Sequence, residues 1–113
     1  MSEKYILVLC TCPEDVVAAR IANVLVEERL AACGNRLSRM TSTYRWEGKV
    51  QTETEALLMI KTAARLLEPL SARIRELHPY ELPEVIALPI EGGSERYLDW
   101  LGQSVAPRGG LNE

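Results

Sequence analysis

Two cysteines separated by one residue, Cys10 and Cys12, are the side chains of this chain best suited to bind a soft metal ion. They end an apolar run that begins at residue 5 and is typical of a strand buried on both faces. Side chains two positions apart on a strand point the same way, about 6.6 Å apart along the backbone. Both thiols could therefore bind one ion such as Cu(I). Two thiols alone are a weak signal, and the alternative, two small buried residues, is favoured by the sequence.

His78 is the only histidine, so a metal centre with several imidazole ligands is excluded. The sequence places it at the end of a predicted helix and directly before Pro79. Two roles stay open for it: a ligand, or a structural residue that caps or packs the helix end. No nucleophile and base can be paired from the order of the residues.

Residues 44–50, Tyr-Arg-Trp-Glu-Gly-Lys-Val, place two aromatic residues and a glycine close together in a chain that has no Phe. Extended segments flank them, so we predict the tip of a β-hairpin, in which Gly48 takes the positive φ that a tight turn needs. A single chain would find it hard to bury Tyr44 and Trp46 at such a tip. The tip is therefore expected to pack against a partner or to form part of a site.

The composition is that of one small globular domain. The chain has 113 residues, of which 47% are hydrophobic and 26% charged. A net charge of −3 with scattered basic residues argues against nucleic-acid binding. The first residues lack the basic start of a signal peptide, and no apolar run is long enough to cross a membrane. We expect a cytoplasmic protein whose three cysteines, Cys33 included, are free thiols.

The elements that must position these residues follow the order βαββαβ, with one further helix. Right-handed crossovers on one face of the sheet then give an α+β, ferredoxin-like sandwich. The predicted strands cover residues 5–10, 33–46, 49–62 and 85–90, and the predicted helices cover 13–30, 65–77 and 95–103. The last helix is expected to turn Tyr97, Leu98 and Leu101 inward. We expect a single domain over residues 1–105 and a flexible tail over 106–113.

The third predicted strand changes character along its length. Residues 51–55 are polar on both faces, whereas residues 56–60 are apolar on both. Such a strand is buried at one end and projects from the domain at the other. The hairpin is then an arm of about ten residues a side, or about 30 Å. Long exposed strand edges associate unless they are paired, so we infer that the arm pairs with another copy of the chain.

Several segments, in the same order, resemble those of the CutA divalent-ion tolerance family, and the match extends from about Ile6 to Leu101. The segments that carry it are residues 28–33, 44–50, 61–62, 78–80 with 83–84, and 97–101. The resemblance implies a cytoplasmic homotrimer with a ferredoxin-like subunit, whose long hairpins pair with neighbouring subunits. It also implies a role in the response to divalent metal ions.

The resemblance also implies site residues. Some family members are described as binding copper through a Cys at the end of the first strand and a pair of His residues before Pro-Tyr. Cys10 and His78 match that pattern, but Leu77 replaces the first His, so the expected copper site lacks a ligand; Cys12 could substitute. The family's motifs further place a ligand cleft between subunits. Its expected lining is Tyr44, Trp46, Lys61, Tyr80 and Glu84.

The leading hypothesis is thus a non-enzymatic homotrimer that binds copper, as Cu(I) or Cu(II), or a small ligand at the clefts between subunits. An alternative is a trimeric scaffold or signalling module without a specific metal site, in which Tyr44 and Trp46 only pack the interface. A small-molecule enzyme is the least favoured, since no nucleophile–base pair is identifiable.

Overall fold

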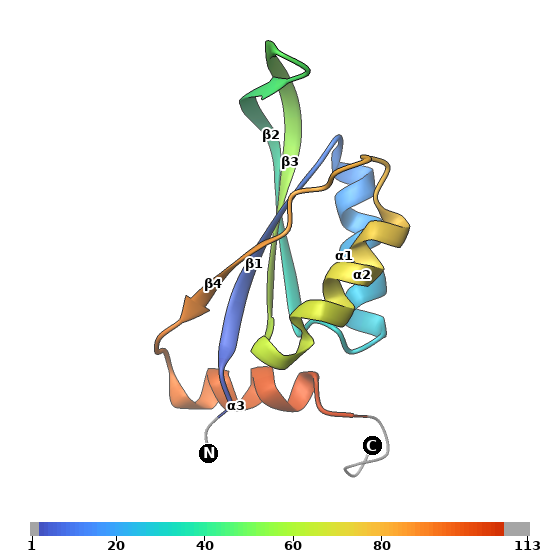
Figure 1. The fold of residues 1–113 in the computed structure, drawn as a ribbon. Coiled ribbons are helices and arrows are strands. Elements are labelled where there is room, and N and C mark those ends of the chain that lie inside the picture. Colours follow the sequence, from blue (N-terminus) through green and yellow to red (C-terminus); the bar gives the residue numbers. More distant parts are fainter. Residues whose placement is uncertain (1–2, 108–113) are drawn as a thin grey trace.

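A computed structural model describes residues 3–107, in which one four-stranded antiparallel sheet packs against helices (Figure 1). The strand order is β2-β3-β1-β4, which is the ferredoxin-like order that the sequence predicted. The elements are β1 (Tyr5–Cys12), α1 (Asp15–Glu27), β2 (Cys33–Trp46), β3 (Lys49–Ala63), the 3-10 turn η1 (Ala64–Leu66), α2 (Leu67–Leu77), β4 (Ile86–Ile90) and α3 (Glu95–Ser104).

The core lies between one face of the sheet and the helices α1 and α2. Side chains alternate along β1, so that Val8, Cys10 and Cys12 are fully buried while those between them are half-buried. Ile21 from α1 and Ile74 from α2 join the same core. The prediction of a first strand buried on both faces was therefore wrong: α1 and α2 both lie on one face (Figure 1), and within residues 3–107 no helix covers the centre of the other face in the same way.

Helix α1 ends three residues earlier than predicted. Arg29 adopts a φ of 61°, and the N–H groups of Leu30 and Ala31 fold back onto the Leu25 carbonyl at 2.9 and 3.1 Å. A left-handed residue just after a helix ends it in this way. Leu30 still packs against the core although it lies outside the helix. This explains why the sequence pattern predicted it as one more core-facing position of α1.

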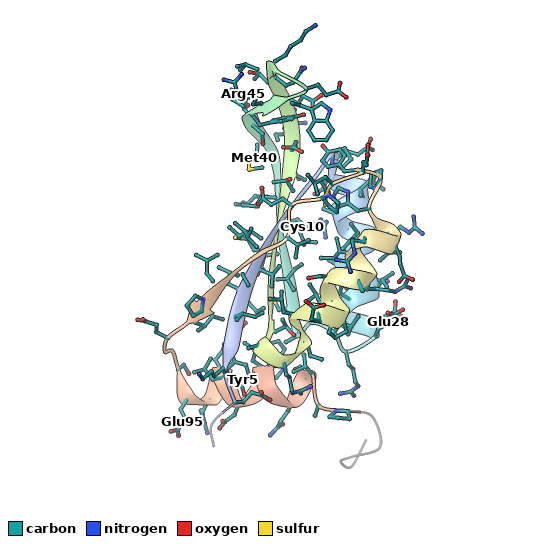
Figure 2. All side chains as sticks on the ribbon, in the orientation of Figure 1. Tyr5, Cys10, Glu28, Met40, Arg45 and Glu95 are labelled. Atoms are coloured by element: carbon teal, nitrogen blue, oxygen red, sulfur yellow. The ribbon has the colours of Figure 1, made fainter. Side chains whose placement is uncertain are left out.

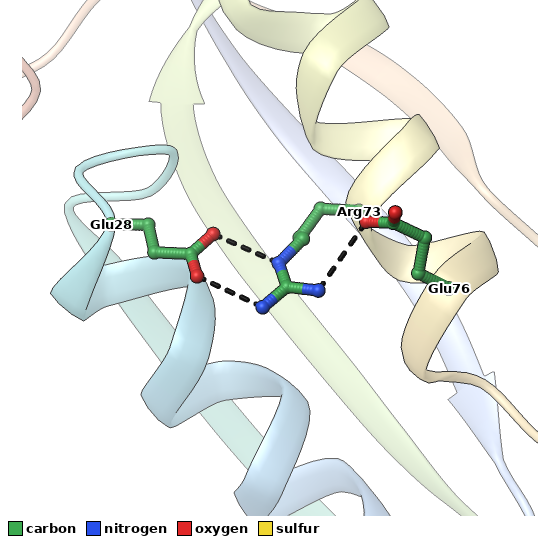
Figure 3. A network of polar contacts seen from close by, with 3 residues as sticks. All are labelled: Glu28, Arg73 and Glu76. Atoms are coloured by element: carbon green, nitrogen blue, oxygen red, sulfur yellow. Dashed lines mark hydrogen bonds and ion pairs between the residues drawn. The ribbon is translucent and has the colours of Figure 1, made fainter.

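An ion-pair network joins the end of α1 to α2 (Figure 3). Arg73 donates two hydrogen bonds of 2.9 Å to the two oxygens of Glu28 and one of 3.3 Å to Glu76. The hydrogen bonds from Arg73 lower the pKa of the Glu28 carboxyl. Because Arg73 binds both oxygens of Glu28, the pair fixes the relative orientation of the two side chains as well as their distance.

The predicted hairpin arm is formed by β2 and β3, which pair from Cys33 opposite Lys61 to Trp46 opposite Lys49. It extends beyond the helices (Figure 1) and makes the molecule long, 50 × 26 × 22 Å. Its turn has Glu47 at φ 50° and Gly48 at φ 79°, as a two-residue turn with two positive φ values requires. A bulge between Leu37 and Met40 interrupts the pairing at the base of the arm.

Helix α3 covers one end of the sheet. Ser94 caps it by accepting a 3.3 Å hydrogen bond from the Tyr97 N–H, and Leu101 packs with Ala32 and Ala63. The inward placement predicted for Tyr97 was wrong, since this residue is 41% exposed and lies beside Trp100. No described helix is long and apolar enough to cross a membrane. Most of the predicted flexible tail, residues 108–113, lies outside the described residues.

Candidate functional site

Cys10, Cys12 and His78 form a buried cluster in which one ligand atom from each lies within 4.8 Å of the others. The two cysteines occupy alternate positions on β1 and so face the helices together. His78 follows α2 and is extended, with φ −85° and ψ 135°, because a residue before proline is disfavoured in the helical region. The end of α2 thereby brings the imidazole to the thiols (Figure 2 marks Cys10 between the sheet and the helices).

The two thiols differ in how readily they lose a proton. A hydrogen bond to Cys12, together with burial, raises the pKa of the Cys10 thiol. The same hydrogen bond lowers the pKa of the Cys12 thiol, since it stabilises a negative sulfur. Cys12 is thus the sulfur that becomes a thiolate first, and thiolate is the form that binds metals.

Both ring nitrogens of His78 are engaged. The Tyr80 N–H donates to Nδ1 at 3.1 Å, and Nε2 lies 2.7 Å from the Thr11 carbonyl oxygen. A backbone N–H can only donate, so Nδ1 is the accepting nitrogen and Nε2 carries the proton that is donated to Thr11. The structural role that the sequence left open for His78 is therefore present, whatever else the residue binds.

The donor set fits a soft ion. Metal–sulfur bonds are about 2.3 Å, so two ligands of one ion are at most about 4.6 Å apart. Separations within 4.8 Å therefore need shifts of only a few tenths of an ångström. Two sulfurs and one imidazole, without a carboxylate in the cluster, suit Cu(I) better than a hard cation.

A cleft of about 920 Å³ lies between the arm and the segment that joins α2 to β4. Four of the residues expected to line a ligand cleft gather here: Tyr44, Trp46, Tyr80 and Glu84. Figure 2 shows the side chains along the arm on which Tyr44 and Trp46 lie, with Met40 and Arg45 labelled.

Sequence reasoning missed two carboxylates of this cleft, Glu53 and Glu55, which β3 contributes. The Tyr44 hydroxyl donates to Glu53, and the Tyr80 hydroxyl donates to Glu55 at 2.6 Å. Glu55 is only 6% exposed. The signal that could have identified them is their spacing, since two acids two positions apart on a strand share a face.

The electrostatics of the cleft follow from this acidic lining. The hydrogen bond to Glu53 raises the pKa of Tyr44 to about 12, and burial with the bond to Glu55 raises the pKa of Tyr80. Burial and the nearby Glu55 also raise the pKa of Glu84. No Lys, Arg or His lines the cleft within the described part of the chain.

Lys61, the fifth residue expected in the cleft, lies elsewhere. Its ammonium donates to the Asn35 side chain at 3.0 Å and lies 5.9 Å from the centre of the Tyr97 ring. Along β3 the nearest residue of the cleft is Leu57, four positions or about 13 Å away. Within one chain, Lys61 does not line the cleft.

The uncovered face of the sheet is apolar near its centre. Leu7 pairs with Leu88 and Leu9 pairs with Ile86, and Ile86 and Leu88 are 52% and 44% exposed. Leu37, opposite Leu57, extends the same surface and is 55% exposed. Among the described strands, β2 and β4 each have a free outer edge beside this face. We call this surface, formed by Leu7, Leu9, Leu37, Leu57, Met59, Ile86 and Leu88, the open face.

Comparison with known proteins gives one consistent result. The model of the CutA1 divalent ion tolerance protein family matches residues 6–104. A divalent-cation tolerance protein CutA of Thermus thermophilus is 49% identical over 98 residues, which are 87% of this chain and 95% of that protein. The chloroplastic protein CutA of Arabidopsis thaliana is 50% identical over 99 residues, which are 88% of this chain. The chain spans about half the length of that protein, 54%.

Solved structures agree with these sequences. The divalent cation tolerance protein Cut A1 of Thermus thermophilus superposes with a TM-score of 0.88 and 47% identity, covering 90% of this chain and 99% of that one. The crystal structure of CutA1 from Oryza sativa gives a TM-score of 0.89 at 46% identity, covering 91% and 94%.

Proposed function

Since the chain belongs to the CutA1 divalent ion tolerance family, we propose that it is a non-enzymatic homotrimer that acts in the response to metal ions by binding copper as Cu(I). Cys10 and Cys12 would hold the ion together with His78. A thiolate pair supplies the soft ligands that Cu(I) prefers, and a neutral imidazole completes the set. The cleft would take a small ligand beside this centre.

The observation that carries the metal proposal is the meeting of three buried donors from β1 and the end of α2 within 4.8 Å of one another. The departure from the family's copper pattern, Leu77 in place of a His, then matters less, because Cys12 supplies a third donor. Its pKa is lowered by Cys10, which favours the thiolate that a metal needs.

Support for the trimer comes from surfaces that a single chain leaves uncovered. The open face presents three large side chains that are 44–55% exposed, Leu37, Ile86 and Leu88, and exposed apolar patches mark interaction sites. The arm, with Trp46 42% exposed near its tip, reaches past the helices of its own chain (Figure 1). In a trimer, Lys61 of a neighbouring copy would supply the positively charged side chain that the acidic cleft lacks.

The copper proposal is tested by titrating Cu(I), without oxygen, against a competing chelator of known affinity. We expect one Cu(I) per chain, and binding weakened at least about tenfold in Cys10→Ser and Cys12→Ser. Cys33→Ser is the matched control, because Cys33 is a free thiol outside the cluster and should leave the affinity unchanged. Equal affinities in all variants would refute the site.

A second candidate function, a trimeric scaffold without a metal site, is favoured by the fact that both nitrogens of His78 already have partners. It predicts no saturable Cu(I) binding and dissociation of the trimer in Trp46→Ala, measured by light scattering. An intact Trp46→Ala trimer that still binds Cu(I) would exclude it.

The cytoplasmic location stays a prediction. Relatives include proteins named as chloroplastic and one from Archaeoglobus fulgidus described as periplasmic. Fractionation of the native host, with the protein followed by antibody, would test the location directly.

A further inference from the structure

Tyr80 belongs to both the thiol–imidazole cluster and the cleft. Its backbone N–H donates to Nδ1 of His78 at 3.1 Å, and its hydroxyl donates to Oε2 of Glu55 at 2.6 Å. The rings of His78 and Tyr80 lie 4.8 Å apart. One residue thus connects a candidate metal ligand to the most buried carboxylate of the cleft.

His78 cannot keep its bond to Tyr80 while it binds a metal ion. A neutral imidazole has one nitrogen with a free lone pair and one with a proton. If Nδ1 became the ligand, its lone pair would no longer accept from the Tyr80 N–H. If Nε2 became the ligand, the ring proton would move to Nδ1. Nδ1–H and the Tyr80 N–H would then be two donors that face each other without an acceptor. With either nitrogen, the Tyr80 amide loses its acceptor.

We propose that filling of the cluster Cys10–Cys12–His78 by a soft metal ion is coupled to a rearrangement of the cleft, transmitted by Tyr80. The inference rests on the metal site of the proposed function and adds its consequence. Release of the Tyr80 backbone frees residues 79–80 to move, and the hydroxyl then leaves Glu55. Thr11 gives a second connection, because its carbonyl accepts from Nε2 of His78 and the residue also lines the cleft.

The coupling works in both directions. In the metal-free state, the Tyr80–Glu55 bond holds residues 79–80 in the position in which the Tyr80 N–H donates to Nδ1 of His78. Metal binding must break this arrangement, so the bond opposes metal binding. By linkage, a ligand that pulls Tyr80 away from Glu55 would tighten metal binding by the same factor that metal tightens the ligand.

The direct test follows single amides by hydrogen exchange in NMR spectra, with and without one equivalent of Cu(I) under reducing conditions. We expect the Tyr80 amide to exchange at least about tenfold faster in the Cu(I) form. The Tyr97 amide is the matched control, since it also donates to a side-chain acceptor, Ser94 Oγ, but lies in α3 away from the cluster. In Cys10→Ser/Cys12→Ser, addition of Cu(I) should change neither amide.

A second test uses affinity. Tyr80→Phe removes the bond to Glu55 but keeps the backbone N–H. The variant should therefore bind Cu(I) at least about fivefold more tightly than the wild type does. Tyr44→Phe is the matched control, because it removes an equivalent tyrosine–glutamate bond of the same cleft that has no connection to His78. Its Cu(I) affinity should equal that of the wild type.

The outcomes separate the two proposals. If Cu(I) binds the wild type but leaves the Tyr80 amide and the Tyr80→Phe affinity unchanged, the coupling is refuted and the metal site stands. If Cu(I) does not bind with the stoichiometry expected above, both are refuted.

Discussion

Glu84 illustrates, at the scale of one residue, how the acidic cleft acts against the stability of its own chain. Burial and the neighbouring Glu55 raise its pKa above the ordinary value of 4.5. A carboxyl whose pKa is raised by folding favours the folded state at low pH. That contribution is lost as the pH rises above 4.5 and through the raised value.

Glu84→Gln should therefore match the wild type in stability near pH 4 and exceed it slightly near pH 7. The gain should stay well below about 1 kcal/mol, because solvent screens a partly exposed carboxylate. Urea unfolding at both pH values, at one protein concentration, measures it. Glu91→Gln, a change of an exposed acid outside the cleft, should show no such gain. A loss of stability at pH 7 in Glu84→Gln would show that the carboxylate has a favourable partner in the assembled protein.

Thr62 holds two elements together through one hydrogen bond. Its hydroxyl donates to the Leu30 carbonyl at 2.7 Å, and the residue is fully buried on β3. The loop after α1 is thereby fixed to β3, one of the two strands of the arm.

Thr62→Val keeps the shape of the side chain and removes its hydroxyl. The Leu30 carbonyl then loses the hydrogen bond that it accepts from Thr62. The expected cost is about 1 kcal/mol in the free energy of unfolding, the usual net contribution of one hydrogen bond, because the bond is only partly buried. Thermal or urea unfolding measures the change, and Thr62→Ser, which retains the hydroxyl, should recover most of it. Equal stabilities of the Val and Ser variants would contradict the argument.

The turn of the arm gives a second prediction at the scale of the element. Gly48 has a φ of 79°, and no atom lies within 4 Å of the position that a Cβ would take. Gly48→Ala should therefore cost only the backbone strain, about 1 kcal/mol. Gly92→Ala is the matched control, since Gly92 has equal space but no positive φ. If both variants lost stability equally, the turn conformation would not be the cause.

The molecule as a whole has one face of its sheet covered by α1 and α2 and one left open (Figure 1). Paired edges and a covered apolar surface would both be gained by association of identical chains. The proposed trimer is thus a prediction about the open face as much as about the arm.

Leu37→Asp combined with Ile86→Asp places charges on the open face and should dissociate the assembly. By light scattering we expect the wild type at about three times the 12.6 kDa of one chain, and the double variant well below that. The matched control is Val16→Asp, a change of an apolar residue that is 65% exposed on α1, and its mass should stay that of the wild type. A double variant with undiminished mass would place the interface elsewhere.

The sequence by itself determined the order of the elements, the ferredoxin-like fold and the arm. These depend on local patterns: the apolar face of α1, Pro69 in the first turn of α2, and Gly48 at the hairpin turn. A local pattern acts through residues a few positions apart, so it can be read from a single chain. The late end predicted for α1 came from Leu30, an apolar residue that packs against the core outside the helix.

Only the tertiary structure decided which distant residues meet. His78 reaches Thr11 across 67 positions, and Tyr80 reaches Glu55 across 25. It also separated Lys61 from the cleft and left one face of the sheet open. The physical reason is that such meetings depend on strand order, register and the face on which helices pack. Residue types restrict these features but do not specify them.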